Sequence, residues 1–320
     1  MVSNQIHRFY SLDTYLKNTF HEKIYKLSLN AGMTCPNRDG LIGTGGCIFC
    51  SEGGSGDFAA SNALSITEQI ESAKALVNKK SLCKHYIAYF QAYTNTYAPY
   101  NYLKRVYLEA LAHPDIVALS IATRPDCLPP EVIELLAECN KIKPVFIELG
   151  LQTCHDNTAE AINRGYSLLV FEQAVAQLNQ EKLPIVVHVI LGLPKENKVH
   201  ILQTIDYLNT QPIHGIKIQL LHVLKSTRLE KLYNDNPADF HMLEFETYID
   251  TVIECLEHLR PDIVIHRITG DGPKNLLLAP SWSANKRLVL NTINQQLAIR
   301  GSYQGKTFVT KGEPPCKRKL

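Results

Sequence analysis

The sequence has no apolar stretch long enough to span a bilayer. Its first residues, Met-Val-Ser-Asn-Gln-Ile-His-Arg, lack the apolar core of a secretory signal. A large excess of either charge is also missing. The formal net charge is +2, which neither demands nor excludes a polyanionic partner. We therefore expect a cytoplasmic protein that does not associate with membranes.

A fourth cysteine or histidine is missing beside the cysteine-rich loop. Cys35, Cys47 and Cys50 lie in a glycine-rich segment that follows a predicted strand at Tyr25–Leu29. A tetrahedral zinc site needs four ligands, and iron–sulfur clusters also prefer four thiolates. Three thiolates therefore indicate a [4Fe–4S] cluster in which one iron is open to another ligand.

The remaining cysteines have no close partner in sequence. The total of nine is odd, which in a reducing compartment favours metal or catalytic use over disulfides. We interpret five of them as packing thiols, namely Cys83, Cys127, Cys139, Cys154 and Cys255. Cys316 lies in a basic tail with Lys306, Lys311, Lys317, Arg318 and Lys319. Such a tail either contacts phosphates or is simply a solvated terminus.

Short apolar runs alternate with helical patterns along the first two thirds of the chain. The predicted strands are Tyr25–Leu29, His85–Phe90, Ile116–Ala122, Val145–Leu151, Ile185–Leu191 and Gly215–Val223. The predicted helices are Ser65–Val77, Tyr100–Ala112, Pro129–Cys139, Leu168–Gln180 and Val199–Leu208. This alternation predicts a parallel α/β sheet with right-handed crossovers. Six units are too few for a complete eightfold barrel.

After Leu224 the pattern changes. We predict a helix at Phe245–Leu259, one more strand at Asp262–Arg267 and a last helix at Trp282–Ala298. The predicted division is an N-terminal extension at 1–24, a partial barrel at 25–224, and a C-terminal α/β extension at 225–320. That extension is expected to cap the substrate side and to carry the basic tail.

Polar residues with period two mark the strand faces that point into the barrel, because the outer faces must pack on helices. The faces marked in this way carry Tyr89, Gln91 and Tyr93 on the second strand, Ser120 and Arg124 on the third, Glu148 and Gln152 with Phe146 and Gly150 on the fourth, and Lys217 and Gln219 on the sixth. Buried charges are costly unless they are paired. Their convergence indicates a ligand site; the alternative is a structural ion network of Glu148, Arg124 and Lys217.

The three-cysteine motif resembles that of the radical S-adenosylmethionine (SAM) superfamily, in which the residue before the last cysteine is aromatic, as Phe49 is here. The eleven residues between Cys35 and Cys47 depart from the usual spacing and point to particular subfamilies. The resemblance implies an open partial (β/α)6 half-barrel with a C-terminal α/β extension. It also implies two cofactors, a [4Fe–4S] cluster and SAM.

Further motifs resemble the catalytic subunit of Elongator. They are Ala122-Thr-Arg-Pro-Asp126, Glu148-Leu-Gly-Leu-Gln-Thr-Cys-His-Asp and Ile162-Asn-Arg-Gly-Tyr. Val189-Ile-Leu-Gly-Leu-Pro194 resembles a turn that lies against adenine, with Lys195 in place of the usual glycine. Oxygen-independent coproporphyrinogen oxidases carry a looser version of the Glu148 run.

The chain is most similar to a bacterial family of Elongator-like radical SAM proteins of about this length. The shared motifs are Phe90-Gln-Ala-Tyr-Thr-Asn-Thr-Tyr97, Gln219-Leu-Leu-His-Val-Leu-Lys-Ser-Thr227, Arg267-Ile-Thr-Gly-Asp-Gly-Pro273, Leu278-Ala-Pro-Ser-Trp282 and Gln304-Gly-Lys306. This resemblance runs from about residue 5 to residue 310.

The resemblance implies roles for individual residues. Cys35, Cys47 and Cys50 would ligate three irons, and SAM would chelate the fourth. The residues implied to bind SAM are Phe49, Gln91, Thr94, Arg124, Glu148, Gln152, Arg164 and Gly192. Gln152 would bind the ribose hydroxyls and Arg164 the carboxylate. Two alternatives stay open: Arg164 caps a neighbouring element, and Gln152 bonds only to backbone.

On the substrate side the candidate catalytic residues are Tyr93, Lys217 and Asp271, with His222 and Arg267 as further candidates. The resemblance implies reductive cleavage of SAM to a 5′-deoxyadenosyl radical. It also implies modification of the C5 side chain of the wobble uridine of tRNA, for example carboxymethylaminomethyluridine to aminomethyluridine. The implied partners are tRNA and an electron donor such as flavodoxin or ferredoxin. The alternatives are a radical SAM oxidoreductase or decarboxylase on a small metabolite, and a non-catalytic metal- or RNA-binding protein.

Overall fold

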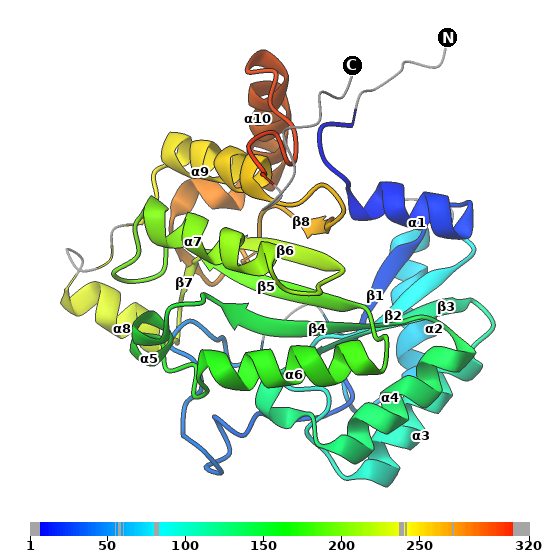
Figure 1. Ribbon diagram of the computed structural model, residues 1–320. Coiled ribbons are helices and arrows are strands. Elements are labelled where there is room, and N and C mark those ends of the chain that lie inside the picture. The colour runs from blue at the N-terminus through cyan, green and yellow to red at the C-terminus, as the bar shows by residue number, and fades with distance from the viewer. Residues whose placement is uncertain are drawn as a thin grey trace.

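Seven parallel strands form one open, curved sheet with helices on its outer face (Figure 1). The computed structural model describes residues 7–54, 56, 59, 61–79, 83–236, 240, 242–270 and 272–309. The strand order β1-β2-β3-β4-β5-β6-β8 follows the chain without a reversal. The predicted parallel half-barrel is therefore confirmed.

The predicted strands and helices lie close to the observed ones. The strands of the large sheet are β1 (Tyr25–Leu29), β2 (Tyr86–Phe90), β3 (Ile116–Thr123), β4 (Val145–Gln152), β5 (Ile185–Leu191), β6 (Gly215–Leu220) and β8 (Val264–Arg267). The helices are α1 (Leu12–Phe20), α2 (Ile66–Asn78), α3 (Tyr100–Ala112), α4 (Pro130–Ile142), α5 (Asp156–Ala161), α6 (Leu168–Gln180), α7 (Lys198–Asn209), α8 (Arg228–Asp235), α9 (Phe245–His258) and α10 (Lys286–Ile299). Short 3₁₀ helices are η1 (Pro125–Cys127) and η3 (Ser281–Ala284). The helices α1, α5 and α8 were not predicted.

The outer face of the sheet is apolar because the helices cover it. Every residue of β2 is buried, and the main core joins the outer sheet face to the helices. Helix α2 begins at a capping box, in which Ser65 and Glu68 satisfy each other's backbone N–H groups. None of the helices in the described part of the chain is long and apolar enough to cross a membrane.

The C-terminal part of the chain returns to the barrel. Strand β8, predicted as Asp262–Arg267, pairs in parallel with β6 and is the seventh strand of the sheet. Strand β6 ends at Leu220, earlier than predicted, and Val223–Leu224 form β7, which pairs with β9 (Leu277–Ala279) in a separate antiparallel ribbon. The domain boundary at residue 224 stays a prediction. The large sheet, however, also includes β8, which comes after that residue.

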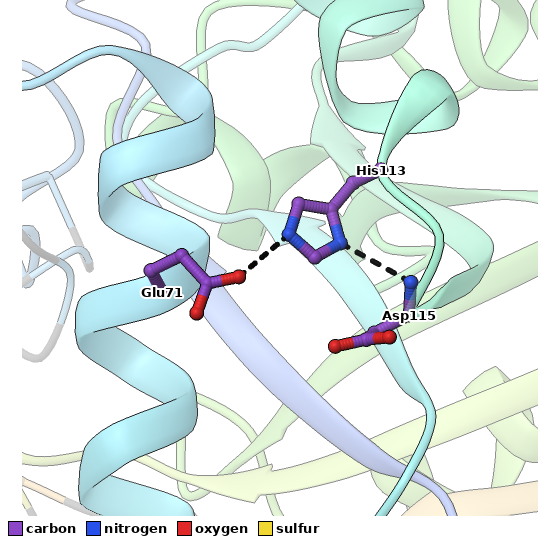
Figure 2. A group of neighbouring side chains, drawn as sticks. All are labelled: Glu71, His113 and Asp115. Atoms are coloured by element: carbon purple, nitrogen blue, oxygen red, sulfur yellow. Dashed lines mark hydrogen bonds and ion pairs between the residues drawn. The ribbon is translucent and has the colours of Figure 1, made fainter.

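Outside the barrel, a polar cluster ties α2 to the turn between α3 and β3. His113 Nε2 lies 2.8 Å from Glu71 Oε1, and His113 Nδ1 accepts the Asp115 N–H at 3.2 Å (Figure 2). The ammonium of Lys74 lies within 2.7 Å of both carboxylates. Because this lysine already pairs with both acids, we interpret the cluster as a structural tie rather than a metal site.

Helix α1 closes the amino-terminal end of the barrel with an aromatic cluster. The Tyr15 ring lies 4.8 Å from His214 and 6.1 Å from Phe146, centroid to centroid. Nδ1 of His214 and both ring nitrogens of His266 are buried without a hydrogen-bond partner among the described residues. Burial lowers the pKa of both imidazoles below the usual 6.5 or so. Both rings are therefore neutral at pH 7.

Neutral buried histidines make stability depend on pH. In the unfolded chain they bind protons below about pH 6.5, whereas in the folded protein they do so only at lower pH. The free energy of unfolding is therefore expected to fall as the pH drops below 6.5. Between pH 7.5 and pH 5.5, the free energy of unfolding measured by denaturant titration should fall less for His214→Phe than for the wild type.

The matched control is His7→Gln, at an exposed histidine, which should keep the wild-type pH dependence. Equal pH slopes for His214→Phe and the wild type would contradict a neutral, buried His214.

Candidate active site

The three predicted cluster cysteines line one cavity of about 170 Å³ at the carboxyl ends of the strands. Cys35, Cys47 and Cys50 come from the loop after β1, and the other side of the cavity is formed by the inner faces of β2 to β6. Ligand sites of parallel α/β sheets lie at this edge.

The long spacer between Cys35 and Cys47 is held by a specific set of hydrogen bonds. Asn37 Nδ2 donates to Asn163 O, and Asn163 Nδ2 donates to Gly46 O, both at 2.7 Å. The Arg38 guanidinium donates to Cys50 O at 2.7 Å and to Ser51 O at 2.6 Å. These contacts fix the second and third cysteines against the first and against the loop after α5.

The cysteines suit a cluster better than a single ion. A zinc ion bound by three thiolates would hold their sulfurs within about 4.6 Å of one another, twice the usual Zn–S distance. Among the described residues, the groups whose ligand atoms all lie within 4.8 Å do not include this trio. Burial, followed by the charge of Cys50, raises the pKa of the Cys47 thiol to about 12. A thiolate here therefore needs a metal-centred positive charge beside it.

The predicted inward faces are confirmed. The cavity is lined by Tyr89, Gln91 and Tyr93 at β2, by Glu148, Gly150 and Gln152 on β4, and by Lys217 and Gln219 on β6. Phe146 lies deeper, in the aromatic cluster at the floor.

Glu148 is the centre of a buried polar network. Its Oε1 accepts hydrogen bonds from Lys26 Nζ and Ser120 Oγ, both at 2.6 Å. Its Oε2 lies 2.7 Å from His188 Nε2 and is paired with the Lys217 ammonium. Lys217 also lies 3.0 Å from the Tyr89 hydroxyl oxygen. Both carboxylate oxygens thus have two partners, which supports the ion-network alternative for Glu148 rather than a SAM contact.

The charge states follow from this crowding. Burial would raise the pKa of Glu148, but Lys217, Lys26 and His188 hold it well below its usual range. Burial lowers the pKa of Lys217 to about 7, against the attraction of Glu148, and Lys26 and Arg267 act in the same direction as burial. Burial likewise lowers the pKa of His188 to about 4, so its neutral ring donates to the carboxylate. Lys26, Lys217 and Arg267 therefore lie around a single carboxylate, that of Glu148.

Arg124 and Gln152 also lie at the cavity, near the cysteines. Arg124 pairs with Asp126, not with Glu148, through a bond of 2.7 Å, and its Nη1 donates to Arg164 O. Gln152 has a positive φ of 63°, and its Oε1 lies 3.4 Å from the Tyr166 hydroxyl. A Cβ on Gly150 would stand 2.7 Å from Gln152 Nε2, so the glycine makes room for this amide. Both side chains can reach a bound cofactor.

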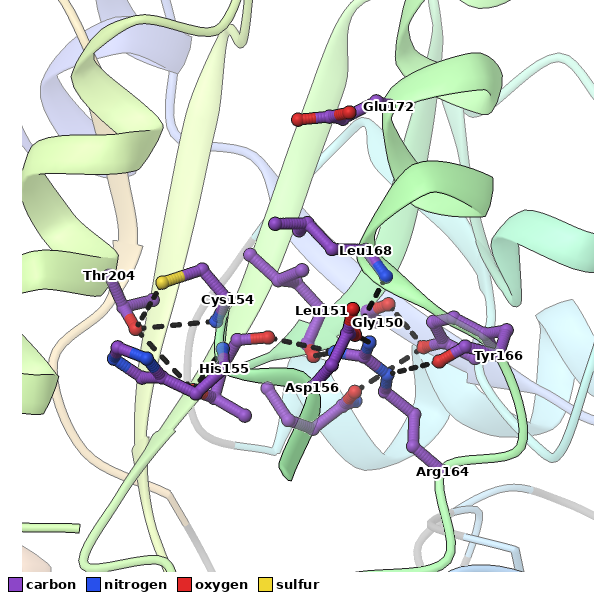
Figure 3. A network of polar contacts seen from close by, with 12 residues as sticks. Gly150, Leu151, Cys154, His155, Asp156, Arg164, Tyr166, Leu168, Glu172 and Thr204 are labelled. Carbon is purple, nitrogen blue, oxygen red and sulfur yellow. Dashed lines mark hydrogen bonds and ion pairs between the residues drawn. The ribbon is translucent and has the colours of Figure 1, made fainter. Parts of the chain in front are cut away.

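Arg164, proposed above for the SAM carboxylate, is used elsewhere. Its side chain is fully buried and is absent from the cavity lining. The guanidinium donates to Leu151 O, Thr153 O, Tyr166 O and Asp156 Oδ1 (Figure 3). With its donors engaged on backbone carbonyls at the end of β4, Arg164 caps that strand. We therefore do not retain it as a cofactor contact.

The other residues predicted to bind SAM differ in whether they line the cavity. Phe49, Gln91 and Thr94 line the cavity, whereas Gly192 does not line it and lies against Leu243. Tyr93 also lines it, but its hydroxyl donates to Glu52 O and its ring packs against Gly54. Asp271, like Cys316 and most of the basic tail, lies outside the described residues.

A second cavity of about 260 Å³ adjoins the first and contains no cysteine. Phe49, Gln91, Gln152, His188, Gln219 and Arg267 line both cavities. His222 and Gly272 line only the second one. Of the candidate substrate residues, His222 therefore lies away from the cysteines, whereas Arg267 lies where the two cavities adjoin.

Sequence reasoning missed four residues of this site. Lys26 and His188 lie on the inward faces of β1 and β5, where the period-two pattern could have found them. Asn37 and Asn163 organise the cysteine loop through contacts 126 residues apart in sequence. No sequence pattern signals such a pairing.

The fold and the three-cysteine cavity define an iron–sulfur enzyme of the half-barrel class. Residues 35–208 match the Radical SAM superfamily, and residues 213–298 match the Radical SAM C-terminal domain. This chain belongs to the radical SAM superfamily, whose members use a [4Fe–4S] cluster and SAM.

Two relatives of similar length match nearly the whole chain. YtqA of Bacillus subtilis is 42% identical over 306 residues, which cover 96% of this chain and 94% of YtqA. YhcC of Escherichia coli K12 is 36% identical over 302 residues, covering 93% and 96% of the two chains. The chain belongs to the same family within the superfamily as these two proteins.

Solved structures show the same fold at low identity. The archaeal Methanocaldococcus infernus Elp3 with an N-terminal deletion superposes with a TM-score of 0.67 at 15% identity. The match covers 88% of this chain and 64% of that structure, so the chain spans less than two thirds of it. Methylornithine synthase (PylB) superposes with a TM-score of 0.51 at 12% identity, over 88% and 83% of the two chains.

Two neighbouring glycines allow a matched test of the cysteine loop. Gly45 and Gly46 both have positive φ, 84° and 73°, so alanine is strained at either. A Cβ on Gly46 would also stand 2.8 Å from Arg38 Nε, whereas nothing lies within 4 Å at Gly45. Gly46→Ala should therefore bind less iron and sulfide after anaerobic reconstitution than Gly45→Ala. Equal cluster content in both variants would contradict the role of Arg38.

The Glu148 network gives a prediction for stability. Glu148→Gln leaves Lys26 and Lys217 without their anionic partner, so the free energy of unfolding should fall by about 3–5 kcal/mol. The double variant Glu148→Gln/Lys217→Met should recover part of this loss, because it also removes one of the two unpaired lysines. Glu254→Gln, which breaks the exposed pair with Lys198, should cost no more than about 1 kcal/mol.

Denaturant titration measures all three variants. A Glu148→Gln protein as stable as the wild type but unable to bind SAM would instead assign Glu148 to the cofactor.

Proposed function

We propose that this radical SAM enzyme modifies the C5 side chain of the wobble uridine of tRNA, converting a carboxymethylaminomethyl group into an aminomethyl group. The main observation in support is that residues from two Elongator-like sequence motifs line the same cavity as the three cysteines. Arg124 of the Thr-Arg-Pro-Asp run lines it, as do Glu148 and Gln152 of the second run. The similarity to the Elp3 fold supports it further.

The residues divide between the two cofactors. Cys35, Cys47 and Cys50 hold the cluster, while Gln91, Thr94, Arg124 and Gln152 surround SAM at the strand ends. Bound together and reduced by one electron, the cofactors supply a 5′-deoxyadenosyl radical that abstracts hydrogen. The polypeptide orients the substrate carbon and excludes water. A flavodoxin or ferredoxin is the proposed source of the electron.

The proposed conversion balances with one SAM. The CH₂ beside the carboxylate loses a hydrogen atom, then an electron and a proton, which gives an imine. Water adds to the imine, and its C–N bond breaks to give aminomethyluridine and glyoxylate. The two electrons lost equal the two that convert SAM into methionine and 5′-deoxyadenosine, provided that the second one returns to the cluster. No further oxidant is then needed, and the electron donor would serve only to prime the cluster.

An anaerobic assay tests this function. Reconstituted protein with SAM, a low-potential reductant and bulk tRNA should release more 5′-deoxyadenosine than the same mixture without tRNA. Mass spectrometry of the digested tRNA should show carboxymethylaminomethyluridine replaced by aminomethyluridine. Cys47→Ser should abolish both signals, whereas Cys83→Ser, outside the loop, should keep them.

A strain lacking the gene provides the second readout. An unchanged wobble-uridine profile in that strain would refute the tRNA substrate. Turnover of a small metabolite without tRNA would then favour the oxidoreductase alternative.

A further inference from the structure

The two adjoining cavities contain more positive charge than their own acid can neutralise. Glu148 is the sole acidic residue among the described residues that line them. Lys26, Ser120, His188 and Lys217 already occupy its two oxygens. No place remains on this carboxylate for Arg267.

Arg267 lies beside this network without a partner in the described part of the chain. It is the last residue of β8, pairs in register with Lys217 of β6, and lines both cavities. No hydrogen bond or ion pair of its guanidinium is found among the described residues. Like charges on paired strands repel each other, so this arrangement costs free energy unless an anion lies between them.

The position of Arg267 favours a substrate anion over a cofactor anion. The cysteines line only the first cavity, whereas Arg267 continues into the second, with His222 and Gly272. Gly272 lines this second cavity, and a Cβ at this position would stand 3.4 Å from His222 Nδ1. A guanidinium is suited to bidentate binding of a carboxylate.

We propose that Arg267, with Lys217 beside it, binds a carboxylate on the reacting substituent of the substrate and so determines which substrate is accepted. This inference rests on the proposed function for the identity of the substituent. Its physical basis, an unneutralised arginine in a cavity with a saturated acid, is independent of that function.

Binding to anticodon stem-loops tests the inference without turnover. The probes carry either carboxymethylaminomethyluridine or aminomethyluridine at the wobble position, and affinity is measured by anisotropy with anaerobic, SAM-loaded protein. Wild type should prefer the carboxylate-bearing probe. Arg267→Gln should lose about 10- to 100-fold in affinity for that probe only, and Arg267→Lys less. Arg300→Gln, at an exposed arginine paired with Asp250, should match the wild type.

Other outcomes overturn the inference. An equal loss for both probes would assign Arg267 to a backbone phosphate. Weaker SAM binding by Arg267→Gln in the absence of RNA would assign it to the cofactor carboxylate. Unchanged affinities for both probes would remove any anion-binding role.

If the wild type binds neither stem-loop, the proposed function fails and small probes decide the inference. N-methylglycine carries the carboxylate, and N-methylglycinamide, which keeps the amine but lacks the carboxylate, is its control. A rise in the unfolding temperature of the wild type with N-methylglycine alone, absent in Arg267→Gln, supports the anion site. No difference between the two probes overturns it.

Discussion

The buried carboxylate of Glu148, on β4, receives hydrogen bonds or ion pairs from side chains of β1, β3, β5 and β6. Five of the seven strands of an open sheet therefore meet at one negative charge. A buried carboxylate is tolerated only because each oxygen has two partners. The same contacts keep Lys26 and Lys217 extended across the inside of the barrel. Glu148 and Lys217 of this network line the cavity above it.

The cysteine loop depends on a second constraint, which is imposed from a distant part of the chain. Asn37 and Asn163 exchange hydrogen bonds with backbone on opposite sides of the loop, and Ile48 N donates to Ile162 O at 3.1 Å. The loop after α5 therefore acts as a template for the cysteines. Arg164, in the same loop, fixes the end of β4 from behind. The Elongator-like run around residues 162–166 thus has an architectural role in this fold.

The fold was predictable because its signals are local. Apolar runs of strand length alternate with amphipathic helices, and α3, α6 and β5 lie at the predicted bounds. The errors occur where tertiary contacts decide. Strand β6 ends early because Val223–Leu224 pair with β9 instead of continuing the sheet. Helix α1 was missed because it is short and is stabilised by packing under the barrel, through Tyr15.

By itself, the sequence determined the three cluster cysteines, the parallel half-barrel and the inward faces of the strands, because spacing and period-two alternation are properties of neighbouring residues. Only the tertiary structure decided which inward residues pair with one another. It committed Glu148 to Lys26, Lys217 and His188, engaged Arg164 on backbone carbonyls, and left Arg267 facing the cavity. Hydrogen-bond partners are chosen by three-dimensional proximity across strands, which a linear pattern does not encode.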